Sequence, residues 1–182
     1  MTDPARARIR GLVFDVDGVL TDGGVYIGGG PDELKRFSVV DGTAFVWCRL
    51  LGYRLALVSG RRSAATAIRG EELGIERVYQ GVRDKAGQVA AWAASEGLAL
   101  DEVLYMGDDH IDAPVFAQVG VSVAPGNAPP AIQALVTHVT ERTGGHGAAR
   151  EAVEWLLAGA GRLDEAIATY LERVTAPERH DA

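Results

Sequence analysis

The sequence has little cysteine, no long apolar run and no excess of positive charge, and each absence narrows the class of protein. Cys48 is the only cysteine in 182 residues, and its apolar surroundings indicate a core thiol rather than a disulfide partner or a nucleophile. No stretch approaches the roughly 18 apolar residues that cross a membrane, and the first ten residues resemble no signal peptide. The net charge of -7 disfavours nucleic-acid binding. We therefore expect a cytoplasmic protein with no membrane or nucleic-acid partner.

The composition is that of an ordinary globular domain, with 47% hydrophobic and 24% charged residues. Short apolar runs predict buried strands at 9–14, 54–58, 77–79, 103–106, 121–124 and around 138. Helical patterns alternate with these strands and cover 41–51, 63–73, 84–96, 111–118, 130–135, 148–158 and 163–174. This alternation is typical of a doubly wound parallel α/β sheet. We predict a single domain over residues 1–182.

One segment departs from this alternation. Residues 24–27 and 34–39 flank the turn-forming stretch 28–32, which is a β-hairpin pattern. The apolar side chains of this hairpin, residues 24–39, belong to no obvious core, and exposed apolar surface of this kind marks association sites. The sequence therefore predicts an oligomer assembled through the hairpin.

Polar residues follow four of the predicted strands. The first strand ends on Asp15, the second on Ser59-Gly60-Arg61 and the fourth on Gly107-Asp108-Asp109, while the loop after the third leads to Lys85. In an open parallel sheet the carboxyl ends of the strands share one edge, and ligands bind beyond it. We therefore expect these residues to meet at one site.

The residues at this edge suit the transfer of a phosphoryl group to an aspartate. Asp15 can attack phosphorus and form an aspartyl-phosphate, while Asp17 can protonate the leaving alcohol and later deprotonate the attacking water. Asp15, the backbone carbonyl of Asp17 and Asp108 are oxygen donors of the kind that Mg²⁺ prefers. Ser59 can donate a hydrogen bond to a phosphoryl oxygen, and Lys85 can neutralise the charge of that group.

Each motif has a plainer interpretation when it is taken alone. The segment 15–18 is also a turn-forming sequence, Ser59 is also a possible helix cap, and a lysine that opens a helix is usually solvated. These interpretations do not explain why several strand ends are polar together. Asp109 is expected to support the metal site without touching the ion. Asp112, one turn beyond Asp108, is expected to orient the loop.

Together the motifs resemble those of the haloacid dehalogenase superfamily. The matching residues are Phe14 to Asp22, Ser59 to Arg61, Lys85 and Gly107 to Asp112, within a pattern that spans 8–123. An acid two residues after the nucleophile marks the phosphatases of that group. The intervals between the motifs leave no room for a lid, so the resemblance implies a capless Mg²⁺-dependent phosphatase. Another subunit is the simplest means of closing such an open site.

The chain is most similar to the family of 3-deoxy-D-manno-octulosonate 8-phosphate phosphatases. The supporting stretches are 24–27, 33–39, 41–42, 74–75, 79–81 and 144–151. The resemblance implies a homotetramer assembled through the hairpin, with a C-terminal helical segment, 144–182, able to cover a neighbour's site. It also implies substrate binding by Ser59, Gly60, Arg61 and Arg150. Arg150 could equally be an arginine on the surface of a helix.

The substrate is where alternatives stay open, because this chain departs from the family at Ala44, Phe116 and His146. The expected substrate is the small phosphorylated sugar acid after which the family is named, 3-deoxy-D-manno-octulosonate 8-phosphate. This substrate implies a role in lipopolysaccharide biosynthesis. The alternatives are a nine-carbon, neuraminate-type 9-phosphate and another small phosphorylated sugar or nucleotide. Outside enzymes, the alternative is a non-catalytic tetrameric assembly module. The intact set Asp15, Asp17, Ser59, Lys85 and Asp108 argues against that alternative.

Overall fold

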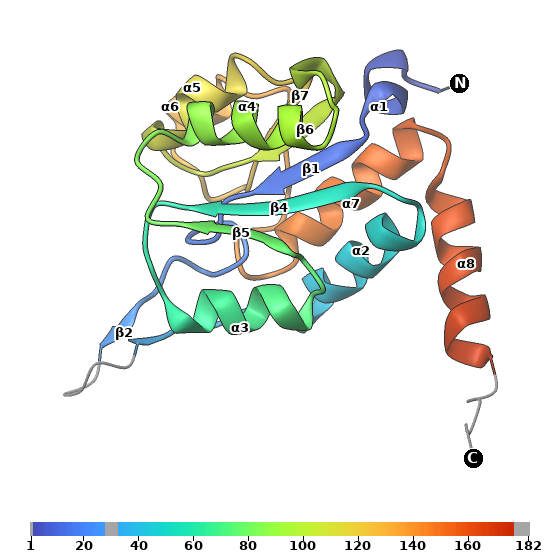
Figure 1. The fold of residues 1–182 in the computed structure, drawn as a ribbon, viewed down its shortest axis with the longest axis horizontal. Coiled ribbons are helices and arrows are strands. Elements are labelled where there is room, and N and C mark those ends of the chain that lie inside the picture. The colour runs from blue at the N-terminus through green and yellow to red at the C-terminus, as the bar shows by residue number, and fades with distance from the viewer. Residues whose placement is uncertain (1, 28–32, 177–182) are drawn as a thin grey trace.

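A six-stranded parallel sheet forms the centre of the computed structural model, which describes residues 2–27 and 33–176 (Figure 1). The strand order is β5-β4-β1-β6-β7-β8. The bounds are β1 (Gly11–Phe14), β4 (Arg54–Ser59), β5 (Arg77–Gln80), β6 (Val103–Met106), β7 (Val121–Ala124) and β8 (His138–Val139). The chain starts at the central β1 and winds outward first to one side and then to the other. This arrangement confirms the predicted doubly wound sheet.

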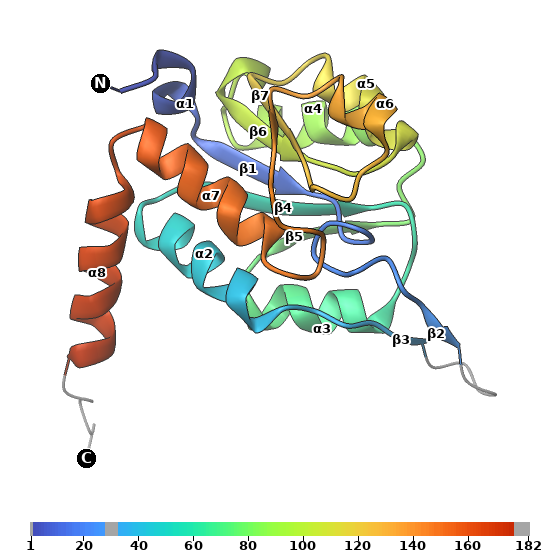
Figure 2. The same cartoon turned by 180° about the vertical axis from the view of Figure 1, so that it is seen from behind.

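Helices cover both faces of the sheet, as Figures 1 and 2 show from opposite sides. One face carries α4 (Lys85–Ser95), α5 (Ala113–Phe116) and α6 (Pro130–Gln133). The other face carries α2 (Val39–Leu50), α3 (Ala64–Glu72) and α7 (Ala148–Gly159). Two further helices pack at the periphery, α1 (Pro4–Arg8) against α7 and α8 (Leu163–Thr175) against α2 and α7. Within the described part of the chain, no helix combines the length and apolar composition that crossing a bilayer requires.

The central strands are apolar throughout because both of their faces are covered. Every residue of β1 and of β6 is buried. Along β1, Leu12 and Phe14 pack into the core under α2 and α7, whereas Val13 packs into the core on the other face. Burial on both faces turns the usual alternation of a strand into a continuous apolar run.

The hairpin projects away from the sheet (Figure 2). It consists of β2 (Tyr26–Ile27) and β3 (Glu33–Leu34), and its predicted turn, 28–32, lies outside the described residues. Tyr26, Ile27 and Leu34 are 59%, 83% and 68% exposed. In the described part of the chain, only the hairpin, α2 and β4 separate the first motif from the second, so no cap domain is present there.

Three predicted boundaries are wrong. The hairpin arm predicted over 34–39 is a strand only as far as Leu34, because the chain enters α2 at Val39. α2 begins two residues before the predicted start at Asp41. An aspartate at the start of a helix is a typical cap, but Asp41 does not cap α2. Instead the buried Asp41 carboxylate accepts a hydrogen bond from the backbone N–H of Arg150 at 2.8 Å, and so caps α7, whose first N–H groups lack partners within the helix. The predicted helix 111–118 is a 3₁₀ turn, His110–Asp112, followed by α5. Pro114 suits the first turn of a helix, which starts α5 at Ala113.

The short helix α1 was not predicted from the sequence. Asp3 caps it, because the carboxylate accepts the N–H of Ala5 at 2.9 Å, and Pro4 occupies the first helical position. Asp-Pro at the start of a helix is a recognisable pattern. Asp3-Pro4 is therefore the sequence signal for α1.

Candidate active site

The loops after β1, β4 and β6 enclose a pocket of about 220 Å³ at the carboxyl edge of the sheet. The register explains why they meet, since Phe14 at the end of β1 lies opposite Leu57 on one side and Met106 on the other. The pocket is lined by Asp15, Asp17, Gly60, Arg61, Lys85, Asp108, Asp109 and Ile111. The structure thus brings together residues that the sequence placed on four separate segments.

Asp15 leaves the end of β1 and is only 5% exposed. Its Oδ2 lies 2.9 Å from Nζ of Lys85, while its buried Oδ1 has no hydrogen-bond partner among the described residues. Burial raises the pKa of Asp15 to about 6, although the charge of Lys85 acts against this rise. A buried carboxylate oxygen without a partner is costly, and here it is available to a ligand in the pocket.

Asp112 is a fully buried acceptor that organises the surrounding groups. Its Oδ1 accepts hydrogen bonds from Nζ of Lys85 at 2.6 Å and from the hydroxyl of Tyr105 at 2.5 Å. Its Oδ2 accepts the backbone N–H groups of Asp108 at 3.0 Å and Asp109 at 3.2 Å. Burial lowers the pKa of Lys85, but the charges of Asp15 and Asp112 outweigh it and raise that pKa overall. Asp112 therefore orients both the loop and a charged Lys85.

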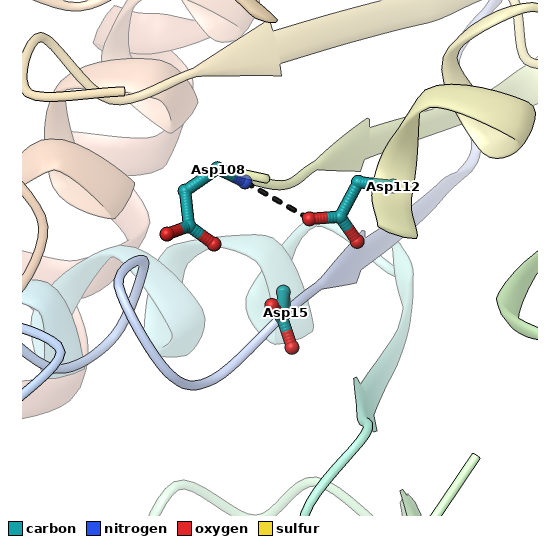
Figure 3. A group of neighbouring side chains, drawn as sticks. All are labelled: Asp15, Asp108 and Asp112. Carbon is teal, nitrogen blue, oxygen red and sulfur yellow. Dashed lines mark hydrogen bonds between the residues drawn. The ribbon is translucent and has the colours of Figure 1, made fainter. Parts of the chain in front are cut away.

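Three carboxylates form a cluster that fits a divalent cation (Figure 3). Oxygen atoms of Asp15, Asp108 and Asp112 all lie within 4.8 Å of one another. Asp112 already accepts four hydrogen bonds, so Asp15 and Asp108 are the better ligands. Burial, followed by the charges of Asp15 and Asp112, raises the pKa of Asp108 to about 7. A cation relieves such crowding of acids, and the carbonyl of Asp17 is the expected third protein ligand.

Asp17 is held at both of its carboxylate oxygens. Nζ of Lys35 donates to Oδ1 at 2.6 Å, and the hydroxyl of Ser59 donates to Oδ2 at 3.4 Å. The sequence motifs do not point to Lys35. The available signal is the alternation along Glu33, Leu34 and Lys35, which places Glu33 and Lys35 on the face of the hairpin opposite to the exposed Leu34. That charged face is turned toward the pocket.

The loop after Asp17 and the segment 144–147 fit together closely. Gly18 has a φ of +88°, and a Cβ there would lie 2.0 Å from an Asp108 carboxylate oxygen. A Cβ on Gly144 would lie 1.8 Å from the carbonyl oxygen of Gly18. The backbone N–H of Gly145 donates to the carbonyl of Val19 at 3.0 Å. The segment 144–147 therefore packs against the loop that follows Asp17 and is not among the residues that line the pocket.

Arg150 lies outside the pocket of its own chain. Its guanidinium sits 4.2 Å from the centroid of a Trp47 ring, and its Nε donates to Glu154 at 2.7 Å. These contacts match the surface-arginine alternative that the sequence left open. A contact between Arg150 and substrate bound to another subunit stays a prediction.

Known proteins are similar to this chain in sequence and in fold. Residues 61–151 match the family model for haloacid dehalogenase-like hydrolases. The chain is 40% identical over 158 residues to the 3-deoxy-D-manno-octulosonate 8-phosphate phosphatase KdsC of Escherichia coli K12, which covers 87% of this chain and 84% of that protein. The crystal structure of the Yersinia pestis phosphatase of that name matches with a TM-score of 0.85 and 39% identity, over 88% of this chain and 86% of that one.

A further solved structure contains ligands. It is the 3-deoxy-D-manno-octulosonate 8-phosphate phosphatase of Moraxella catarrhalis in complex with a magnesium ion, a phosphate ion and a KDO molecule. It matches with a TM-score of 0.87 and 32% identity, over 91% of this chain and 95% of that one. Both the sequence and the fold agree over most of the chain. The chain belongs to the haloacid dehalogenase-like hydrolase family.

Proposed function

We propose that the chain is a Mg²⁺-dependent phosphatase that cleaves a phosphomonoester through a phosphorylated Asp15. The observation that carries the proposal is the unpartnered, buried Oδ1 of Asp15 beside Asp108, with Lys85 on the other oxygen. This arrangement offers a nucleophile, a cation and a metal site in one small pocket. The phosphatase names of the relatives support it.

The residues of the chain divide the reaction between them. A carboxylate oxygen of Asp15 bonds to phosphorus, and the bond from phosphorus to the leaving oxygen breaks as that oxygen takes a proton from Asp17. Asp17 then takes a proton from the water that attacks phosphorus, which releases phosphate and restores Asp15. Lys85 neutralises charge on the phosphoryl oxygens, and Ser59, Gly60 and Arg61 bind the phosphorylated substrate. Mg²⁺, when bound, offsets the charges of phosphoryl group and carboxylates.

We infer that the substrate is 3-deoxy-D-manno-octulosonate 8-phosphate. The names of the relatives and the KDO molecule in the Moraxella catarrhalis structure support this substrate. A nine-carbon, neuraminate-type 9-phosphate and another small sugar phosphate are the alternatives, because Ala44 and His146 depart from the family. A place in lipopolysaccharide biosynthesis and a cytoplasmic location accompany this substrate and stay predictions.

A substrate panel tests this proposal. With Mg²⁺ present, kcat/KM for phosphate release is expected to be at least about tenfold higher on the eight-carbon 8-phosphate than on a nine-carbon 9-phosphate or glucose 6-phosphate. A preference for the nine-carbon compound would overturn the substrate assignment alone. No phosphate release from any phosphomonoester would overturn the enzymatic proposal and favour the assembly module.

We also propose that each chain contributes one domain to a homotetramer held together by the hairpin. The exposed apolar side chains of Tyr26, Ile27 and Leu34 support this, since burial of such surface drives association. Light scattering at micromolar concentration is expected to give the mass of four 19.2 kDa chains. Ile27→Lys should dissociate the assembly. Leu171→Lys, which changes an exposed apolar residue on α8, should not, and a monomeric wild type would contradict the proposal.

A further inference from the structure

We propose that Lys35 is a positioning residue for Asp17, so that the hairpin sets the place of the acid/base in the reaction. The inference rests on the proposed function, because it assigns a partner to the acid/base of that reaction. Lys35 directly follows β3, and its side chain is 0% exposed. Neither the metal site nor the roles given to Lys85 and Arg61 make use of it.

The contacts of Lys35 identify Asp17 as its main partner. Nζ lies 2.6 Å from Oδ1 of Asp17, 3.5 Å from the hydroxyl of Thr66 and 3.6 Å from Oε1 of Glu33. A buried ammonium group must be paired, and a short charge-assisted hydrogen bond is the strongest pairing available to it. Of these three contacts, only the one to Asp17, at 2.6 Å, has the length of a charge-assisted hydrogen bond.

Asp17 depends on this contact for a defined orientation. Among the described residues, its second oxygen is held by the hydroxyl of Ser59 alone, at the longer distance of 3.4 Å. Asp17 also lies in a loop outside any helix or strand, followed by Gly18. An acid/base must be held within a fraction of an ångström of the atom whose proton it moves. Loss of Lys35 would leave the carboxylate free to rotate away from the leaving oxygen.

A charge network ties this orientation to the hairpin. Glu33, on the same face of the hairpin as Lys35, pairs with the guanidinium of Arg61, which lines the pocket. Charges of alternating sign therefore run from Arg61 through Glu33 and Lys35 to Asp17. The opposite face of the same strand carries the exposed Leu34. One short strand thus offers an apolar face outward and a charged face to the site.

A direct role in holding substrate is the competing interpretation of Lys35. The structure favours positioning, because the side chain of Lys35 is fully buried and its ammonium group is already engaged with Asp17. A side chain of this kind acts on the reaction through its partner.

The test compares Lys35→Met with wild type on two substrates. The alcohol of 3-deoxy-D-manno-octulosonate 8-phosphate needs a proton from Asp17 as it leaves, whereas p-nitrophenolate leaves without one. We expect kcat on the 8-phosphate to fall about 30- to 100-fold, with KM changed less than about threefold. The single-turnover rate of p-nitrophenolate release should change less than about threefold.

Matched variants separate positioning from a general disturbance of the hairpin. Arg36→Met removes the adjacent cation, whose guanidinium contacts the carbonyl of Gly145 and not Asp17, and should change both rates less than about twofold. Lys35→Arg keeps a cation and should recover part of the loss. Added to Asp17→Asn, Lys35→Met should lower the residual rate on the 8-phosphate no further. Lys35→Gln supports the same comparison if Lys35→Met does not fold.

Several outcomes would overturn the inference. Equal losses on both substrates, an additional loss in the Asp17→Asn background, or no loss at all would each do so. A rise in KM without a fall in kcat would make Lys35 a substrate-binding residue instead. A wild type that releases phosphate from neither substrate would overturn both the proposed function and the inference. The outcomes above, by contrast, require an active wild type and overturn the inference alone.

Discussion

Replacement of Asp15 by asparagine is expected to lower kcat for phosphate release by at least about 10³-fold, with little change in KM. The amide keeps the size of the side chain but cannot attack phosphorus. Oδ1 of Asp15 is buried and has no partner among the described residues, and Oδ2 faces Lys85 at 2.9 Å. Among the described residues that line the pocket, no other carboxylate has a buried oxygen without a partner. Phosphate release at saturating Mg²⁺ and substrate measures the effect.

Asp22→Asn is the matched control for this variant. The same chemical change is made in the same loop, but the Asp22 carboxylate lies outside the pocket and accepts the N–H of Gly24 at 2.9 Å. Its activity should stay within about threefold of wild type. Burial raises the pKa of Asp15, so its charge costs free energy in the metal-free fold, and asparagine should not lower the free energy of unfolding. More than a tenth of wild-type activity in Asp15→Asn would exclude Asp15 as nucleophile.

Removal of Mg²⁺ by excess chelator should abolish turnover, and its return should restore it. Asp15 and Asp108 place two negative charges where a phosphate dianion must bind, and without a cation they repel it. Asp108→Asn should raise the Mg²⁺ concentration for half-maximal activity at least about tenfold. Asp109→Asn is the control. The sequence predicts that Asp109 supports the metal site, but its carboxylate is exposed and bonded to His110, so this variant should change the Mg²⁺ requirement little. Persistent activity in excess chelator would contradict the role given to Asp108.

The same carboxylates give the metal-free protein a defined pH dependence. Burial raises the pKa of Asp15 from 3.8 to about 6, and burial with neighbouring charge raises that of Asp108 from 3.8 to about 7. At pH values between 3.8 and the raised pKa of each group, that carboxyl binds more protons in the folded state than in the unfolded chain. The contribution of both groups to stability therefore increases as pH falls from about 8 to 5. Mg²⁺ competes with those protons, so it should raise the melting temperature more at pH 8 than at pH 5.5.

The sheet and most of the pocket could be predicted because both follow from local patterns and one topological rule. The apolar run before Asp15 and the one before Asp108 each form a strand buried on both faces. In a parallel sheet, residues that follow such strands share an edge. The meeting of Asp15, Lys85 and Asp108 at one site can therefore be predicted without any information on side-chain packing.

The contacts that could not be predicted join segments far apart in the chain. Lys35 reaches Asp17 across 18 residues, and Arg150 reaches the carboxylate of Asp41 across 109. Asp41 has the local sequence of a cap for its own helix, but packing of α2 against α7 makes it the cap of the other. Such pairings depend on how the helices and the hairpin pack on the sheet. The local hydrophobic periodicity of the sequence does not predict that packing.

The phosphorylation of Asp15 itself is the most direct test of the central claim. The protein would be quenched in acid during turnover of 3-deoxy-D-manno-octulosonate 8-phosphate with Mg²⁺, and its peptides analysed by mass spectrometry. We predict a phosphoryl group on Asp15 in wild type and none in Asp15→Asn. Phosphate release by wild type with no trapped phosphoryl group at any time, or with that group on another residue, would contradict the account.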